Sequence, residues 1–200
     1  MLNRRTILLA STANGLTALG LGVPAVVGAQ EPGATPNTPS TAPPPPEIAS
    51  ELPGAAWAGT GRMRYFTFNV YDAALWVAPG FSAHRYAQSP FALQLRYLRS
   101  LDGHAIAQRS LVEMRRGTSL TPAQEQRWLA AMQQAFPDVK AGDHITGLHQ
   151  PGVGARFWFN GAPRGVVTDT EFSRLFFGIW LADSTSEPGL RTALLARAAP

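Results

Sequence analysis

A chain of 200 residues that is 45% hydrophobic and 15% charged is long enough to bury one core, so we expect one folded domain. It contains no cysteine, which excludes disulfides, a thiolate nucleophile and thiolate metal ligands. Without Arg4 and Arg5 the chain has 15 basic and 13 acidic residues, and no basic stripe follows, so we expect no nucleic-acid partner.

Residues 1–29 are predicted to be a secretory signal peptide. Arg4 and Arg5 form a charged start, an uncharged apolar run covers 7–27, and small residues precede a cleavage point after Ala29. The segment Asn3–Leu8 resembles the twin-arginine export signal of bacteria. We therefore expect an exported, periplasmic protein that contacts the membrane only if this leader is not cleaved.

Residues 30–53 are expected to form a disordered linker. The segment is rich in proline, threonine, serine and alanine, with four consecutive prolines at 43–46. Such a composition buries too little apolar surface to offset the entropy of ordering, and it favours extended geometry. The folded domain is therefore expected over 54–200.

The stretch 62–71 alternates with a period of two, which predicts a strand. One face carries Arg62, Arg64, Phe66, Phe68 and Val70, and the other carries Met63, Tyr65, Thr67, Asn69 and Tyr71. A strand that offers rings and two fixed cations together could line a pocket for a molecule with an apolar body and a polar head. The alternative is that the arginines extend into water at a sheet edge. The chain is then expected to bend at 69–72 and to continue as a second strand over 73–77.

The rest of the domain is predicted to alternate between groups of strands and groups of helices. Strands are expected at 90–99, 145–149, 156–159 and 166–167, and helices at 103–116, 121–136, 168–181 and from 186 onward. Thr121 and Gln124 form a capping box, and Asn160-Gly161 suits a tight hairpin turn. This order indicates an α+β fold, an antiparallel sheet with helices packed on one face.

The sequence contains few patterns that are typical of a catalytic site. The four histidines show no metal-ligand spacing, so no metal site is expected, and there is no Gly-x-Ser-x-Gly segment. Glu113 is expected to pair along its helix with Arg109 and Arg116. The alternative is that Glu113 acts as a general base in a dry site.

Several segments, in this order and spacing, resemble the chalcone-isomerase-like domain in its bacterial exported branch. They are Gly59–Arg64, Val70–Leu75, Leu95–Tyr97, Glu113–Arg116, Phe136–Val139, Gly142–Asp143, Phe176–Leu181, Leu190–Arg191 and Leu194–Leu195. The resemblance implies an open-faced β-sandwich, a curved antiparallel sheet with a layer of helices and a cleft between them. The resemblance covers nearly the whole predicted domain, and no cofactor is expected.

The resemblance implies two different functions. Plant chalcone isomerases close a flavanone ring, whereas related non-catalytic members bind fatty acids in the same cleft, with an arginine holding the carboxylate. The catalytic tyrosine of the enzymes falls near Ile106 here, and their asparagine falls at Glu113. Their arginine has a counterpart in Arg62 or Arg64, which suits a carboxylate because arginine bonds it bidentately.

We therefore expect first a binding protein for a small amphipathic anion such as a fatty acid. The residues expected to bind it are Arg62 or Arg64 as the anchor, Tyr71 or Tyr97 as a second donor, and Phe66, Phe68, Phe176 and Trp180 as walls. The first alternative is an isomerase of chalcone type or on another substrate, with Glu113 as the candidate catalytic carboxyl. The second alternative is a protein-interaction module.

Overall fold

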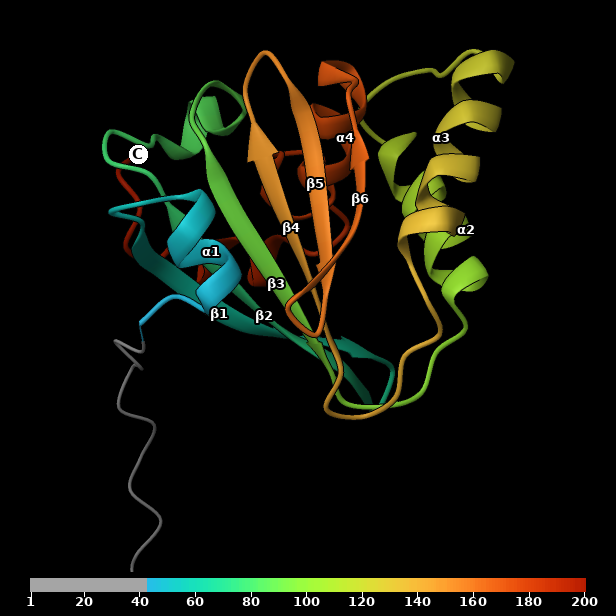
Figure 1. The fold of residues 1–200 in the computed structure, drawn as a ribbon, viewed down its shortest axis with the longest axis horizontal. Helices are drawn as coiled ribbons and strands as arrows, with labels where there is room; N and C mark the ends of the chain where they lie inside the picture. The colour runs from blue at the N-terminus through green and yellow to red at the C-terminus, as the bar shows by residue number, and fades with distance from the viewer. Residues whose placement is uncertain (1–42) are drawn as a thin grey trace, which may run out of the picture. The chain divides into compact units, whose positions relative to one another are not determined.

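A computed structural model describes residues 43–200, which form one six-stranded antiparallel sheet with helices packed against it (Figure 1). The strands pair in chain order and are β1 (Ala56–Tyr65), β2 (Phe68–Val77), β3 (Phe91–Tyr97), β4 (His144–Gln150), β5 (Gly154–Phe159) and β6 (Ala162–Val167). This arrangement confirms the α+β, open-faced sandwich fold. The predicted signal peptide and most of the predicted linker lie outside the described residues.

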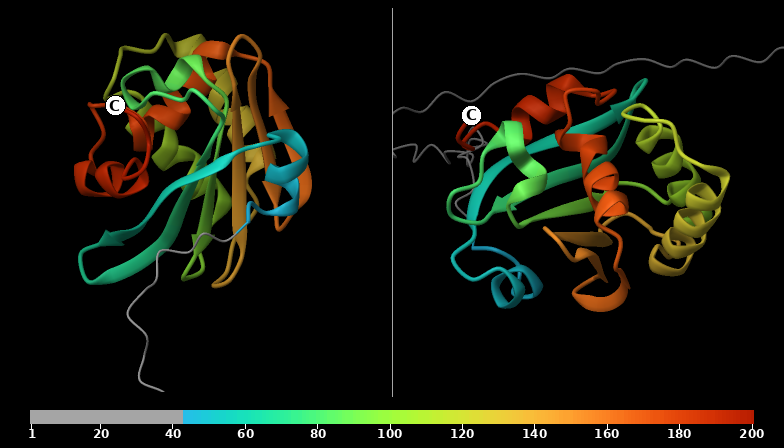
Figure 2. Two further views of the ribbon diagram at one scale, coloured as in Figure 1. Left: turned by 90° about the vertical axis from the view of Figure 1, so that its left-hand side faces the viewer. Right: turned by 90° about the horizontal axis from the view of Figure 1, so that it is seen from above.

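β1 and β2 form one long hairpin, and its turn lies at Phe66 and Thr67. The turn expected at 69–72 is wrong, because Asn69 pairs with Arg64 inside the hairpin. Phe66 has a φ of 52°, a left-handed conformation that phenylalanine rarely adopts, so its residue type gave no turn signal. Figure 2 shows this turn projecting beyond the neighbouring strands.

One face of the sheet, which we call the inner face, is covered by four helices. They are α2 (Gly103–Met114), α3 (Pro122–Ala135), α4 (Thr170–Leu181) and α5 (Pro188–Leu194), and a short 3-10 helix, η1 (Ala83–Gln88), precedes β3. Alternate strand residues such as Leu75, Phe91 and Phe157 point into this layer and form the main core. α4 packs on β4 and β5 and is itself packed by α2, so it is apolar on nearly all sides, as the sequence indicates.

Local capping signals fix two of these helices. Thr121 accepts a hydrogen bond from the Gln124 amide, and the Gln124 side chain accepts one from the Thr121 amide, which confirms the predicted capping box. At α4 the cap is Asp169, whose carboxylate accepts hydrogen bonds from the amides of Glu171 and Phe172. The same carboxylate accepts a hydrogen bond of 2.9 Å from the indole of Trp128, which ties α3 to α4.

Helix α5 approaches β1 with no room for a side chain between them. A Cβ atom on Gly59 would lie 2.2 Å from the carbonyl oxygen of Ala193, and one on Gly61 would lie 2.6 Å from Leu190 Cδ1. Two glycines spaced by two residues therefore mark the face of β1 that the helices cover.

The opposite, outer face is partly covered by helix α1 (Pro46–Glu51). Its Ile48 and the following Leu52 are buried against a second apolar cluster that includes Trp76, Leu148 and Trp158. The C-terminal part of the expected linker is therefore helical and packed on the sheet. The composition of this segment did not indicate a helix, because Ile48 and Leu52 are two apolar residues among many polar residues and prolines.

Within residues 43–200, none of the helices combines the length and the apolar character that crossing a membrane requires.

Candidate functional site

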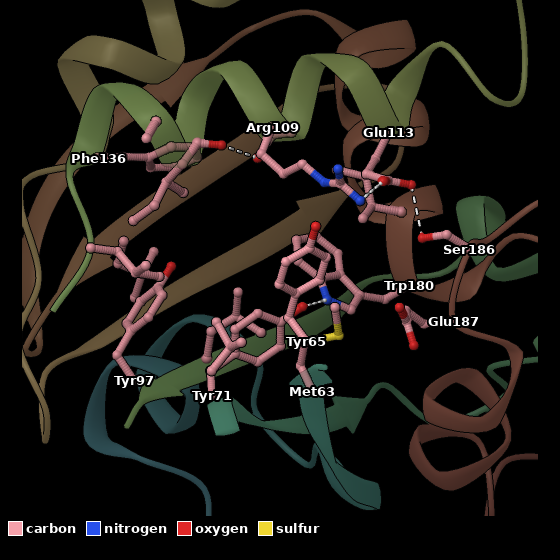
Figure 3. A pocket seen from close by; sticks show the side chains of 18 of the residues that line it. Met63, Tyr65, Tyr71, Tyr97, Arg109, Glu113, Phe136, Trp180, Ser186 and Glu187 are labelled. Atoms are coloured by element: carbon pink, nitrogen blue, oxygen red, sulfur yellow. Dashed lines mark hydrogen bonds and ion pairs between the residues drawn. The ribbon is translucent and has the colours of Figure 1, made fainter. Parts of the chain in front are cut away.

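A cavity of about 330 Å³ lies between the inner face of the sheet and helices α2 and α4 (Figure 3). The sheet contributes residues from four strands, and helices α2 and α4 contribute one stripe each. On α2 the stripe is Ile106, Arg109, Ser110 and Glu113, which occur at i, i+3, i+4 and i+7 and so lie on one helix face. The walls are mostly apolar, with a few polar groups at defined places.

Two tyrosines on neighbouring strands form the floor of the cavity. Tyr71 of β2 and Tyr97 of β3 are directly paired in the sheet, and their ring centroids lie 6.0 Å apart, edge to face. Both line the cavity, as does Leu95 on the same face of β3. The strand register thus places two phenol hydroxyls in one mostly apolar chamber.

The hydroxyl of Tyr71 is held by helix α4. The indole Nε1–H of Trp180 donates a hydrogen bond of 3.0 Å to the Tyr71 oxygen (Figure 3). Among the described residues the Tyr71 hydroxyl takes part in this one side-chain hydrogen bond, as the acceptor, and the Tyr97 hydroxyl takes part in none. Each phenol therefore keeps a donor that a ligand oxygen can use.

Removal from water keeps both phenols protonated. Desolvation raises the pKa of Tyr71 to about 12, against an ordinary value near 10, and the hydrogen bond from Trp180 offsets this only in part. Burial also raises the pKa of Tyr97. At neutral pH the two residues are hydrogen-bond donors and not anions.

Glu113 forms the centre of a charged cluster at one end of the cavity. Its carboxylate accepts hydrogen bonds from Arg116 Nε at 2.7 Å and from Ser186 Oγ at 2.9 Å. The guanidinium of Arg109 adds an ion pair at 2.5 Å without hydrogen-bond geometry. Only 6% of the Glu113 side chain is exposed. The pairing of Glu113 with Arg109 and Arg116 that the sequence predicts is therefore present. Because two arginines share one carboxylate, these three residues together carry one net positive charge.

Arg99, just after β3, lies at the edge of the same cavity. Its guanidinium carbon lies 5.0 Å from the centroid of the Phe68 ring, a cation–π contact. In the part of the chain that the structure describes, no carboxylate forms an ion pair with Arg99. Its positive charge is therefore available to an anionic group at the cavity entrance.

The structure brings together about half of the residues expected at the site. Tyr71, Tyr97, Phe176, Trp180 and Glu113 all line the cavity. The position that corresponds to the tyrosine of the chalcone isomerases, Ile106, lines it as well. This position offers an aliphatic wall and no hydroxyl.

The two arginines expected as the anchor lie elsewhere. Arg62 pairs with Asp72 through two contacts of 2.6 and 2.9 Å, and Arg64 donates to Asn69 at 3.2 Å, all on exposed atoms. Neither arginine lines the cavity. Both arginines instead extend into water, which is the alternative stated for this strand from the sequence.

Phe66 and Phe68 also lie outside the cavity, exposed at the hairpin turn. The face of β1 that does reach the cavity carries Met63 and Tyr65. The signal for this choice is Gly59 and Gly61, which continue the alternation of Met63 and mark the face on which α5 packs. Arg99 and Arg109, which also line the cavity, were not among the residues predicted for the site.

Residues 43–200 contain no group of three or more acidic or histidine side chains placed to hold a metal ion. The hydrogen-bond donors in the cavity include the phenols of Tyr71 and Tyr97 and the guanidinium of Arg99, and the carboxylates of Glu113 and Glu187 line it as well.

Comparisons with known proteins agree with this architecture. A model of the family described as chalcone isomerase-like matches residues 56–196. An uncharacterized protein of Haemophilus influenzae is 28% identical over 150 residues, which cover 74% of this chain and 72% of that protein. The crystal structure of an Arabidopsis thaliana fatty-acid binding protein has a TM-score of 0.57 at 11% identity, over 72% of this chain and 87% of that one.

Proposed function

The chain belongs to the chalcone isomerase-like family, and from this premise we propose that it binds a small amphipathic acid in the cavity between the sheet and α2. The apolar part of the ligand packs between the aromatic walls. Its acidic head meets the phenol and guanidinium donors. The protein acts as a carrier or receptor for this ligand and not as a catalyst.

One observation carries the proposal: two protonated phenols without an internal acceptor share a largely apolar cavity with two arginines. Tyr71 and Tyr97 supply the hydrogens and Arg99 supplies positive charge at the edge, whereas Arg109 is paired with Glu113. Unused donors in an apolar chamber favour a ligand that brings its own acceptors. A carboxylate brings acceptors and negative charge together.

The size of the cavity supports a small ligand. Its volume of about 330 Å³ lies at the lower end of the range of roughly 300–1,000 Å³ that ligand cavities usually span. We therefore favour a medium-chain fatty acid or an aromatic acid of similar bulk. That the structurally similar Arabidopsis protein is a fatty-acid binding protein supports the same ligand class.

The alternative, an isomerase, is less well supported by the same residues. The carboxylate of Glu113 accepts hydrogen bonds from Arg116 and Ser186 and pairs with Arg109, so both of its oxygens already face groups of the protein. Ile106 cannot polarise a substrate, because it has no hydroxyl. These two side chains favour binding over catalysis.

We also propose that the protein works outside the cytoplasm. The support is the sequence of residues 1–29, with its paired arginines, apolar run and small residues before Ala29. Fractionation of the producing bacterium, followed by immunoblotting, tests this location. Recovery with the cytoplasmic fraction at full length would contradict it.

The direct test of binding is calorimetry with decanoate, alongside native mass spectrometry of the freshly purified protein. We expect decanoate to bind with one-to-one stoichiometry and decanol, which has the same chain without the charge, to bind more weakly. A protein that carries no co-purified acid and shows no heat with decanoate or with an aromatic acid of similar size would overturn the proposal.

A further inference from the structure

The turn of the β1–β2 hairpin exposes three aromatic rings, which we call the aromatic tip: Tyr65, Phe66 and Phe68. Their exposed fractions are 57%, 84% and 57%, and within residues 43–200 they are the large aromatic side chains exposed to this degree. Tyr65 and Phe66 pack edge to face with centroids 4.8 Å apart. Exposed rings gathered at one place, and not scattered, indicate a contact surface.

The aromatic tip is surrounded by positive charge. Arg64 bonds only the neutral side chain of Asn69, and Arg99 stacks on Phe68. Among the ion pairs of the described chain neither residue has a carboxylate partner, whereas Arg62 beside them is neutralised by Asp72. Residues 63–69 contain no acidic residue.

The acidic residues that follow β3 and α3 do not cancel this charge by pairing with it. Asp102 and Asp138 each accept a hydrogen bond from an amide in the first turn of α2, Asp102 from Ala105 and Asp138 from Gly103. Their carboxylates are held by the helix start.

From this combination we propose that the aromatic tip docks on the anionic surface of a phospholipid bilayer. Aromatic rings favour the boundary between headgroups and acyl chains, and arginines favour anionic headgroups. The projection of the turn beyond the neighbouring strands lets it reach such a surface ahead of the rest of the hairpin (Figure 2).

The tip is also continuous with the cavity. Tyr65 and Arg99 both line the cavity, and they contact Phe66 and Phe68 respectively. Docking would therefore place the cavity entrance at the bilayer, where an amphipathic acid partitions; this last step rests on the proposed function. The docking itself does not depend on the ligand.

The absence of cysteine permits a direct test in the full chain. Thr67→Cys, at the exposed turn, is labelled with a polarity-sensitive fluorophore and mixed with vesicles of phosphatidylcholine and phosphatidylglycerol in a 3:1 ratio. The matched control is Val153→Cys, an exposed residue in the turn between β4 and β5. The label reports insertion of the aromatic tip itself. Its signal does not depend on how the rest of the chain contacts the vesicle.

We expect a blue shift at residue 67, a smaller one with pure phosphatidylcholine, and none at residue 153. Adding Phe66→Ser and Phe68→Ser should abolish the shift, and Arg64→Gln should weaken vesicle binding about fivefold. Equal emission with and without vesicles, or equal shifts at 67 and 153, would overturn the proposal. A shift that grows with protein concentration without vesicles would assign the tip to a second copy and would overturn it too. If the tip inserts but the protein does not bind decanoate, the docking proposal stands and only the ligand proposal is overturned.

Discussion

The indole of Trp180 donates to the hydroxyl oxygen of Tyr71 across 3.0 Å, so the phenol accepts from helix α4 and keeps its own hydrogen for the cavity. This one bond sets both the position and the polarity of the phenol. A hydroxyl that already accepts a hydrogen bond is a better donor, because neighbouring bonds polarise one another.

Replacing Tyr71 by phenylalanine should therefore weaken acid binding without emptying the cavity. A hydrogen bond to a charged group contributes about 1.5–3 kcal/mol, so we expect the decanoate Kd to rise by about 10- to 150-fold. Calorimetry measures it. Tyr86→Phe is the control, because the Tyr86 hydroxyl donates to the Arg174 carbonyl and does not line the cavity. Equal losses for both variants would contradict the assigned role.

A comparison of Arg99 with Arg62 provides a second test. Of these two arginines, Arg99 lines the cavity, while Arg62 is paired with Asp72 on the other face. We expect Arg99→Gln to lower decanoate affinity several-fold while leaving decanol affinity unchanged, and Arg62→Gln to change neither. Measurements at low and high salt separate the charge effect from packing. A larger loss of affinity from Arg62→Gln would instead assign the anchor to Arg62, as predicted from the sequence.

Stability should decrease at alkaline pH through Tyr71. The unfolded chain ionises this phenol near its ordinary pKa of about 10, whereas the folded protein holds the pKa at about 12. The unfolded state thus binds fewer protons between about pH 10 and 12, and the free energy of unfolding should fall there by about 2 to 3 kcal/mol. Urea unfolding at several pH values measures this. In Tyr71→Phe the fall should be smaller, and an identical profile would refute the assignment.

Stability should also decrease at acid pH through His149. Desolvation lowers the pKa of this buried histidine, whose ring nitrogens contact the Ser173 hydroxyl at 2.7 Å and the Ala87 carbonyl at 3.0 Å. Below about pH 6.5 the unfolded state takes up a proton that the folded state does not, so unfolding becomes easier. Thermal melts between pH 8 and 5 should show this fall. His84 is exposed to a greater degree, so His84→Gln serves as the control and should keep the acid sensitivity of the parent.

Glu113→Gln should destabilise the fold by leaving Arg109 and Arg116 without their shared carboxylate. Both arginines are more than half exposed, so solvent compensates in part, and we expect a loss of about 1–2 kcal/mol in urea unfolding. Ser186→Ala, which removes one hydrogen bond and no charge, should cost less. The role assigned to Glu113 is to orient Arg109. The decanoate affinity should therefore change less in Glu113→Gln than in Tyr71→Phe.

Much of the architecture could be predicted because local chemistry determined it. The capping box at Thr121 and Gln124 and the tight turn at Asn160-Gly161 need only a few neighbouring residues, and both are present. The hairpin turn at Phe66 could not be found in this way. Its left-handed backbone is imposed by the pairing of β1 with β2 and not by a glycine or asparagine.

The choice of strand face was the part of the site that alternation alone could not decide. Large side chains lie on both faces of β1, so Arg62 and Tyr65 seemed equally able to reach a cleft. Only long-range packing distinguishes them, through the approach of α5 at Gly59. Arg99 was missed for a related reason, because a residue beyond the end of β3 has no pattern of its own.

Helix α1 has a practical consequence for preparing the domain. A recombinant fragment that begins at residue 54, where the folded part was expected to start, would lack Ile48 and Leu52. The apolar cluster around Trp76, Leu148 and Trp158 would then face water, an uncovered patch of the kind that promotes self-association. Fragments for crystallisation should therefore begin at or before residue 43, and a poorly soluble shorter fragment would report the loss of this cover, not a failure of the sheet to form.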